Sequence, residues 1–495
     1  CLGVYIGHNH DINYKLNWTN KIKSMEKVLC NWSKRKISLF GKVQVIKTFV
    51  ISKIIFSASV LPVPNDVVKT ISSIIFKYLW GKRDRIKRST VMQYKQNGGL
   101  SMINLENFFL SLKAGWIDKI LHCNGKWSDF VTHKLKILNI DIDYLVKTSF
   151  TKAEEFPVIC TLPKFYQDVI VAFNKCKYVK EFNSLNDSEV FQLPLWGCKY
   201  FKDNSRCLYL SNWVKSGILY VKDLVSQNGI LYSDHELFQI PQDMRNIIAD
   251  VFILKKAVIK KLKTLNVSIA PYVKIKSITH LLFQNKLIEI KNSRSNLYYR
   301  MLQSKSYTRG NMETVYSAEF KFENHRHVWN NIYMQKIIDI RLPKVREFDY
   351  KILHNIVASG YMLYKWKKID DDKCQYCQNI ETMKHMLYEC PRILEIWEEI
   401  SNVLKCNISW KLIVCGFPKY ELNEKVSSIN YIIGIICYNI FKQNSYCKFN
   451  NVNYKYLRLK KIILEDISFQ SRLLQIVHPE VYNTITFKRF IDTYA

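Results

Sequence analysis

The chain of 495 residues holds 74 Lys and Arg against 42 Asp and Glu, which gives a formal net charge of +32. Its content of 48% apolar and 14% aromatic residues excludes a disordered chain, and its length allows about three domains. This charge predicts a polyanionic partner, most simply nucleic acid. An A/T-biased coding sequence is the alternative source of the many lysines.

The 14 cysteines form no regular framework, and no signal peptide opens the chain. We therefore expect reduced thiols and a cytoplasmic and nuclear protein that is not secreted. No stretch reaches the ~20 apolar residues of a membrane-spanning helix, so no membrane partner is expected. The chain begins at Cys1 within a strand-like run, LGVYIG, as a piece of a longer protein would.

In chain order, residues 2–6 predict a short strand, and three amphipathic helical stretches follow, beginning near Lys21, Gly41 and Asn65. The densest basic run of the chain, residues 82–88, follows the third stretch. Asn104 is expected to cap a fourth helix. Residues 1–125 are therefore predicted to end a strand and form a helical bundle with a basic loop.

The remaining chain divides by pattern into four parts. Residues 126–270 predict a mixed α+β region whose topology stays open, and residues 271–370 a helical connector. Residues 371–400 predict a small zinc-knuckle segment, and residues 401–495 a helical C-terminal region. The predicted fold class is mainly α and multi-domain.

The knuckle prediction rests on Cys374, Cys377, His385 and Cys390, which form a C-x2-C-x7-H-x4-C array. Three thiols and one imidazole are the ligand set of a closed, tetrahedral structural zinc site. Acidic and polar neighbours indicate that the array lies outside the apolar core. The alternative is coincidence in a chain rich in Cys. Four protein ligands would leave no open position for catalysis.

The sequence offers no catalytic centre. A polymerase needs carboxylates that converge on Mg²⁺, and only Asp141 and Asp143, which would alternate on one strand face, provide a weak candidate. Asp370–Asp372 is interpreted as a solvated loop leading into the knuckle. No phosphate-binding loop, dinucleotide fingerprint or nucleophile elbow is present. We therefore expect no catalytic residues and no small-molecule substrate.

Several motifs resemble the thumb of non-LTR retrotransposon (LINE-type) reverse transcriptases. They are Asn31–Val43, Val45–Thr48, Ser52–Ile54, Val60–Pro64, Phe76–Lys82, Gly98–Leu105 and Leu112–Trp116. The middle of the chain resembles the region that follows the thumb in the same proteins, through Leu162–Tyr166, Pro194–Trp196, Trp213–Ile218 and Val221–Leu224. The knuckle, with Glu381 and Thr382 before His385 and Trp397 after Cys390, is similar to the family's C-terminal Cys/His segment. The resemblance is collinear over nearly the whole chain.

The resemblance implies the C-terminal part of an RNA-directed DNA polymerase, without the palm aspartates. Mg²⁺ would belong only to that missing palm, and this chain alone would not be catalytic. Thumb helices and knuckle would hold RNA and DNA, as template–primer or as target DNA and element RNA, during target-primed reverse transcription. The alternative function is a decayed or domesticated remnant that acts as a zinc-dependent binding or scaffold protein. An independent metallo-hydrolase would need an open metal position. Nothing predicts the oligomeric state.

Basic residues beside apolar helical faces fit the nucleic-acid role, because one face packs while the other presents cations. The candidate contacts are Lys34, Arg35, Lys36, Lys42, Lys47, Lys82, Arg83, Arg85, Lys87 and Arg88. For any single lysine the alternative is a solvated helix face, whereas the cluster at 82–88 favours phosphate contact. Trp32, Trp80 and Trp116 are interpreted as core residues in preference to base-stacking ones.

Overall fold

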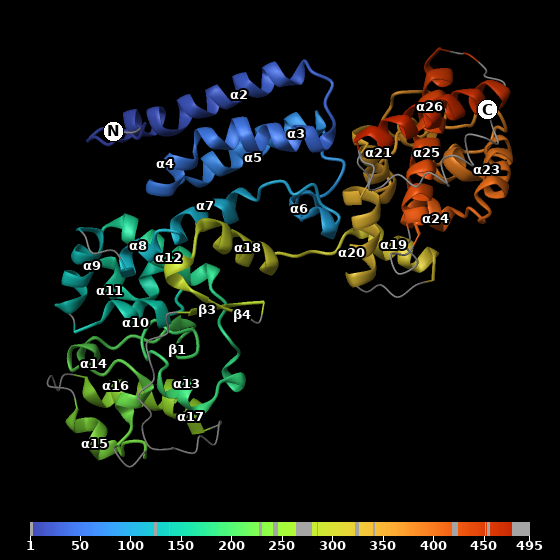
Figure 1. The fold of residues 1–495 in the computed structure, drawn as a ribbon. Coiled ribbons are helices and arrows are strands. Elements are labelled where there is room, and N and C mark those ends of the chain that lie inside the picture. The colour runs from blue at the N-terminus through green and yellow to red at the C-terminus, as the bar shows by residue number, and fades with distance from the viewer. Residues whose placement is uncertain are drawn as a thin grey trace. The chain divides into compact units, whose positions relative to one another are not determined.

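The computed structural model describes residues 3–122, 126–137, 139–226, 230–240, 246–263, 280–284, 286–321, 326–339, 342–417, 424–450, 452 and 456–477, and it is mainly α-helical (Figure 1). The chain forms two compact units, each built from three chain segments. Unit 1 comprises residues 1–24, 51–72 and 104–307, and unit 2 comprises residues 25–50, 73–103 and 308–495. Helices α2 (Asn20–Ser33) and α5 (Asn65–Trp80) each have their N-terminal part in unit 1.

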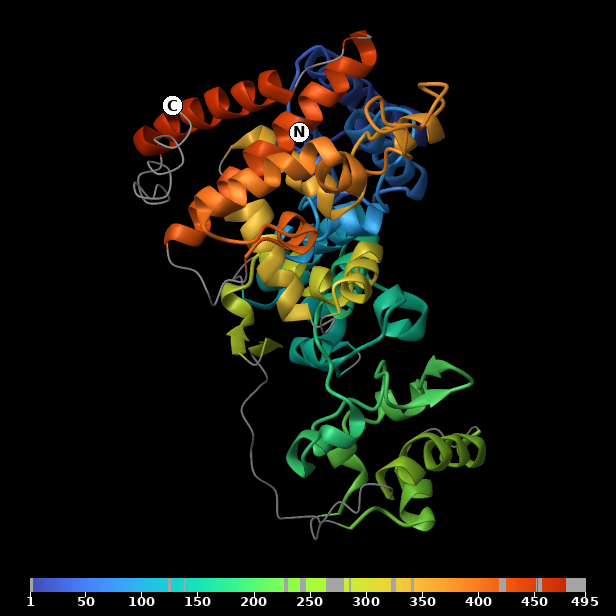
Figure 2. The ribbon, with the colours of Figure 1, turned by 90° about the vertical axis from the view of Figure 1, so that its right-hand side faces the viewer.

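The helices of unit 1 are short. They are α1 (His10–Tyr14), α4 (Ile55–Val60), α7 (Leu105–Ala114), α8 (Ile117–His122), α9 (Lys126–Lys136), α10 (Ile142–Lys147), α11 (Pro157–Cys160), α12 (Lys164–Cys176), α13 (Asp187–Phe191), α14 (Ser211–Lys215), α15 (Asp234–Gln239), α16 (Ile247–Leu254), α17 (Lys260–Lys263) and α18 (Ser295–Lys305). Helix α7 packs against both α12 and α18, and Figure 2 gives a second view of the ribbon.

The core of unit 1 follows from apolar residues at helical spacing. On α12, Val169, Ile170 and Phe173 are fully buried, as expected for one apolar face of an amphipathic helix. The side chain of Asn104 accepts a hydrogen bond from the backbone N–H of Asn107 at 3.2 Å, so the predicted cap of α7 is confirmed. Trp196 is buried, and its backbone N–H donates to the Tyr144 hydroxyl at 3.1 Å.

Strands are few in the described ranges. They form two antiparallel hairpins in unit 1, β1 (Lys202–Asp203) with β2 (Arg206–Cys207), and β3 (His280–Phe283) with β4 (Lys286–Glu289). Residues 3–6 are not a strand, so that part of the predicted strand is wrong, and residue 2 lies outside the described residues. The backbone N–H and C=O of Tyr5 instead bond the side-chain amide of Asn17, at 2.9 and 2.7 Å, so these groups do not join a strand ladder.

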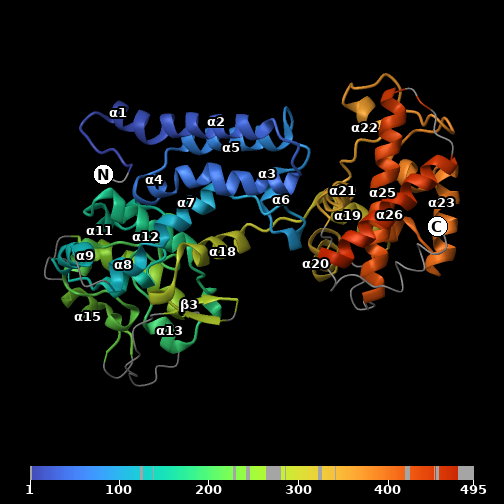
Figure 3. The same ribbon diagram turned by 45° about the horizontal axis from the view of Figure 1, so that its top comes forward.

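Unit 2 contains the longest helices. Its helices are α3 (Leu39–Val45), α6 (Arg88–Met92), α19 (Asn311–Glu319), α20 (Arg326–Tyr333), α21 (Pro343–Leu353), α22 (Gly360–Lys365), α23 (Pro391–Leu404), α24 (Trp410–Cys415), α25 (Glu424–Asn450) and α26 (Tyr456–Val477). Helices α25 and α26 pack side by side (Figure 3). Helix α21 packs on α25, where the rings of Phe348 and Phe441 lie 4.9 Å apart. Both long helices thereby contribute to one apolar interior.

Hydrogen bonds between distant segments hold unit 2 together. The buried Nε2–H of His354 donates to the backbone oxygen of Gly98 at 2.8 Å, and the N–H of Leu39 donates to Glu347 at 3.1 Å. Gly98 has φ +76°, and a Cβ there would lie 2.5 Å from the Tyr333 ring. Only glycine fits both the conformation and the space.

Two further expectations are corrected. Asp141 and Asp143 lie at the start of α10 and not on a strand, because Ile142 onward is helical. The predicted helical connector, 271–370, contains the hairpin β3–β4; its residues 271–279 lie outside the described residues. The other domain boundaries stay predictions. No helix in the described parts of the chain has the length and apolarity needed to cross a membrane.

Candidate metal centre

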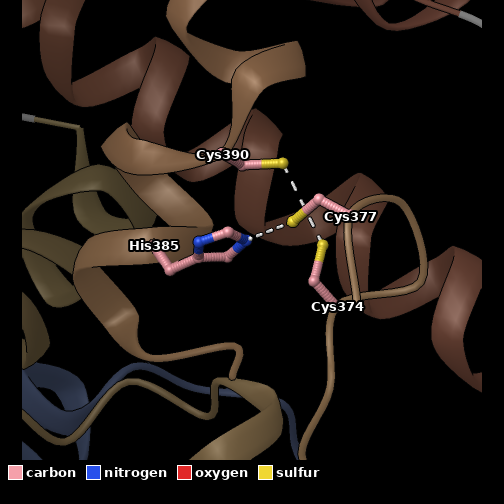
Figure 4. A group of neighbouring side chains, drawn as sticks. All are labelled: Cys374, Cys377, His385 and Cys390. Atoms are coloured by element: carbon pink, nitrogen blue, oxygen red, sulfur yellow. Dashed lines mark hydrogen bonds between the residues drawn. The ribbon is translucent and has the colours of Figure 1, made fainter. Parts of the chain in front are cut away.

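The four residues of the Cys/His array come together in unit 2. Cys374 and Cys377 lie in one loop. His385 begins η11 (His385–Glu389), a π-helix of one turn, and Cys390 immediately precedes α23. One ligand atom from each lies within 4.8 Å of all the others. Figure 4 shows the two loop cysteines facing His385 and Cys390. The four residues of the predicted array therefore lie together.

Local backbone structure explains this convergence. The N–H of Cys374 donates to the backbone oxygen of Asn379 at 2.8 Å, and Gln378 adopts φ +61°. The chain therefore turns tightly between Lys373 and Ile380, which form an isolated antiparallel bridge. The tight turn at 385–389 then reverses the chain. Pro391 occupies the first turn of α23, where its missing N–H costs nothing.

The distances fit one tetrahedral ion. The Sγ atoms of Cys374 and Cys390 are 4.0 Å apart, and Cys377 Sγ lies 3.1 Å from His385 Nε2. Around Zn²⁺, ligand atoms at ~2.0–2.3 Å from the metal lie about 3.5–3.8 Å from one another. The two observed separations lie on either side of that spacing. Donor types and geometry therefore both suit zinc.

The electrostatics of the cluster favour a thiolate. The hydrogen bond from Cys390 and the backbone N–H groups of Tyr376 and Cys377 hold the pKa of Cys374 well below its usual value, at about 4. The same Cys374–Cys390 hydrogen bond raises the pKa of Cys390. Because zinc binds thiolates, the lowered pKa of Cys374 favours metal binding.

The cluster is more buried than expected. Cys374, His385 and Cys390 are 3%, 5% and 2% exposed, so the expectation of a site outside the interior is wrong. The reason is that α25 covers the knuckle: the Tyr376 hydroxyl contacts Cys447 Sγ at 3.8 Å. All four donors belong to the chain, so the arrangement suits a structural ion.

Glu381 connects the knuckle to two helices and was missed as a functional residue. Its carboxylate is 2% exposed and accepts from the Gly360 N–H at 2.8 Å and from Asn444 at 3.1 Å, and it pairs with Lys448 at 3.2 Å. A buried carboxylate is tolerated when it is paired and hydrogen-bonded. The family resemblance includes Glu381, but its partners lie far away in sequence, so no local signal indicated these contacts.

The basic residues at 34–36 are exposed. The Arg35 guanidinium lies 4.7 Å from the centroid of Trp32, which is half-buried and stacks on Phe49. Trp32 is therefore not a fully buried core residue. Trp80 and Trp116 are also only partly buried.

The side chains of Lys42 and Lys47 are partly buried within the protein. Lys42 Nζ donates to the backbone oxygens of Tyr78 and Leu79 at 3.3 and 3.2 Å, at the C-terminus of α5, where a cation is favourable. Burial lowers the pKa of both lysines. The structure thus gives Lys42 a capping partner within the protein.

The basic run 82–88 is exposed except at Ile86. Three of its predicted contact residues have partners in unit 2: Arg85 lies 4.4 Å from the Trp366 centroid, Lys87 donates to Asn311 at 3.3 Å, and Arg88 pairs with Asp84 at 2.7 Å. These contacts arrange the run along the surface of the unit.

Comparison with known families places the cluster in context. Residues 311–397 match the family described as zinc-binding in reverse transcriptase, and this match includes all four residues of the array. No curated protein matches the chain. The C-terminal region is therefore related to the zinc-binding region of reverse transcriptases.

Proposed function

We propose that Cys374, Cys377, His385 and Cys390 bind one structural zinc ion in a nucleic-acid-binding chain. The observation that carries this is a three-thiol, one-imidazole cluster within the segment that matches a reverse-transcriptase zinc-binding family. Zinc supplies no chemistry to a substrate at such a site, because all four positions are filled by the protein. Its role is to fix the knuckle loop, η11 and the start of α23 around one point.

The wider role is that of the C-terminal part of a non-LTR (LINE-type) RNA-directed DNA polymerase. This part holds template–primer, or target DNA and element RNA, and is not catalytic alone. The thumb-like motifs between Asn31 and Trp116 and the net charge of +32 support it. A protein with such a charge binds phosphate backbones by releasing their counterions, whatever the sequence. The place of action is then the cytoplasm and the nucleus.

The test uses the full chain and two measurements. The first is zinc content by atomic emission, and one ion per chain is expected. The second is fluorescence anisotropy with labelled RNA and DNA at rising KCl concentration. A steep linear fall of log affinity with log salt is expected, because each neutralised phosphate adds about 0.7–0.9 to the slope. Zinc binding without measurable nucleic-acid binding would contradict the polymerase role and favour the domesticated scaffold instead.

A further inference from the structure

Helix α22 exposes two aromatic rings on one face. Tyr361 is 41% and Tyr364 is 50% exposed, whereas Leu363 is 8% exposed. Residues three and four apart lie on the same side of a helix, about 5–6 Å from one another, so Tyr361, Tyr364 and the exposed Lys365 share a face while Leu363 points inward. Two exposed rings on one helix face are able to stack on bases.

Two more cations follow directly. Lys367 and Lys368 are exposed and end α22 in a tight cap, in which the N–H of Lys368 donates to Leu363 at 2.9 Å. Lys367 adopts φ +55°, a conformation that glycine adopts at less cost. The strained position is thus held by a residue whose charge points to solvent.

The basic run 82–88 contacts α22 at its C-cap residue. Arg85 lies over the Trp366 ring at 4.4 Å. We call Tyr361, Tyr364, Lys365, Lys367 and Lys368 the α22 surface.

We propose that the α22 surface binds single-stranded nucleic acid, with bases stacked on Tyr361 and Tyr364 and phosphates at the lysines. The proposal rests on the proposed function and narrows its partner. Exposed aromatic rings beside a basic track are what unpaired strands need, since every base has a face that stacks. In a duplex the bases already stack on one another, so the two rings would gain nothing from it.

An acidic stretch limits the surface on one side. Asp370–Asp372 follows Lys368 within a few residues, and Asp371 accepts the N–H of Lys373 at 3.0 Å as the chain enters the knuckle. Carboxylates repel phosphates over about 8–10 Å at moderate salt. We therefore expect the bound strand to run away from Asp370.

The knuckle holds the two rings in place. Glu381, between Cys377 and His385, accepts the N–H of Gly360 through its carboxylate at 2.8 Å and the N–H of Tyr361 through its backbone oxygen at 3.0 Å. A Cβ at Gly360 would lie 2.9 Å from the Glu381 Cβ, so the contact is close. The metal centre and the stacking face are thus joined by one residue.

The test compares single strands with a duplex on the full chain loaded with zinc. The probes are oligo(U), oligo(dT) and an RNA duplex of equal length. The double variant Tyr361→Leu/Tyr364→Leu keeps the helix and an apolar side chain but removes the rings. It should bind both single strands about tenfold to a hundredfold more weakly, while duplex affinity stays unchanged. Tyr361→Phe/Tyr364→Phe keeps the rings and should retain parental affinity.

Tyr178→Leu is the matched control, because Tyr178 is 57% exposed and belongs to unit 1. It should change nothing, and zinc content should be equal in all variants. Replacing Lys365, Lys367 and Lys368 with Gln should reduce the single-strand salt slope by about 2. Asp370→Asn should strengthen single-strand binding.

The outcomes separate the two proposals. Equal single-strand affinity in parent and Leu variant, or an equal loss on the duplex, would overturn the stacking surface alone. A parent that binds none of the three probes would overturn the proposed function itself. Loss on oligo(U) without loss on oligo(dT), or the reverse, would assign the surface to RNA or to DNA.

Discussion

At the scale of single residues, Lys367 shows how backbone conformation and charge compete. It adopts a left-handed conformation one residue after Trp366, the C-cap of α22, and Lys405 does so at the C-cap of α23, with φ +50°. In each case the next N–H closes the cap, to Leu363 or to Ser401. The two lysines are therefore equivalent in conformation and differ only in their surroundings.

Replacing either lysine with glycine should stabilise the fold by ~0.5–1 kcal/mol, because the left-handed conformation costs an L-residue more than glycine. Lys367→Gly should also weaken single-strand binding, whereas Lys405→Gly should not. Chemical denaturation and anisotropy measure the two effects. If both variants bind like the parent, Lys367 makes no contact with the strand.

His354 makes the stability of unit 2 depend on pH. Burial lowers its pKa to about 4, although its N–H donates to Gly98. The unfolded chain takes up this proton near its usual pKa of 6.5, so it binds more protons than the folded chain between these values. Stability should therefore fall as pH drops from about 6.5 to about 4, by an amount on the order of 3 kcal/mol.

The variant His354→Gln isolates this effect, because it keeps a donor for Gly98 but does not titrate. Denaturant unfolding between pH 4 and 7 should show a smaller loss of stability in the variant than in the parent. Other groups add their own pH dependence: burial raises the pKa of Glu313, which bonds Tyr333 beside the His354 ring. Parallel curves for the two proteins would show that His354 titrates normally.

The metal ligands were predictable from sequence, but the contacts of Glu381 that connect the knuckle to α22 and α25 were not. Cys374 to Cys390 lie within one short stretch, so their spacing alone indicates a shared ion. Glu381 contacts Gly360, Asn444 and Lys448, whose separation along the chain hides the relation. The sequence YMLYKWKK of residues 361–368 places aromatic and basic residues together, which could have indicated the α22 surface. Aromatic residues at helical spacing, however, equally predict a core.

At the scale of elements, sequence reasoning succeeded where a signal was local. Asn104 caps α7 because a side-chain oxygen can reach an N–H three residues on. It failed where an element depends on a partner, as in the strand expected at residues 2–6. Asp141 and Asp143 show the same limit: alternation indicated a strand, yet residues 142–147 form α10.

The basic run 82–88 belongs to this scale, because its effect comes from several charges together. Replacing Arg83, Arg85, Lys87 and Arg88 with Gln should weaken binding to all sequences and flatten the salt slope by up to about 3–4 on duplex. Arg85, Lys87 and Arg88 already have partners within unit 2. We therefore expect the salt slope to change by less than this maximum. Anisotropy over a KCl series measures it.

A control with the same charge change uses unit 1. Four of its exposed lysines are Lys134, Lys136, Lys152 and Lys215. Their replacement with Gln lowers the net charge equally, so any general effect of charge appears in both variants. Equal slopes for the two quadruple variants would remove the run 82–88 from the interface.

At the scale of the whole molecule, zinc should stabilise unit 2 and not unit 1. Cys374→Ser should abolish zinc binding and, through Glu381, loosen α22, α23 and the C-terminal part of α25. Hydrogen exchange should show lost protection there, while α7 and α12 keep theirs. Cys30→Ser, at an exposed cysteine, should alter neither property. Equal zinc content in Cys374→Ser and parent would refute the site.

The grouping of segments into units could not be predicted from the chain. The bond from His354 to Gly98 and that from Leu39 to Glu347 join residues hundreds of positions apart. Helical periodicity reports which face of a helix is buried, but it does not identify what covers that face. The mainly α fold class was therefore within reach, and the composition of each unit was not.

The discontinuity of unit 2 has a consequence for how the protein is made. Residues 25–50 and 73–103 leave the ribosome well before their partners, which begin only at residue 308. Synthesis of the roughly 200 residues between them takes about 10–40 s at ~5–20 residues per second. During this delay the early segments lack the part of unit 2 that packs on them later, such as α21 on α3. Newborn chains should therefore be clients of chaperones until the knuckle has emerged.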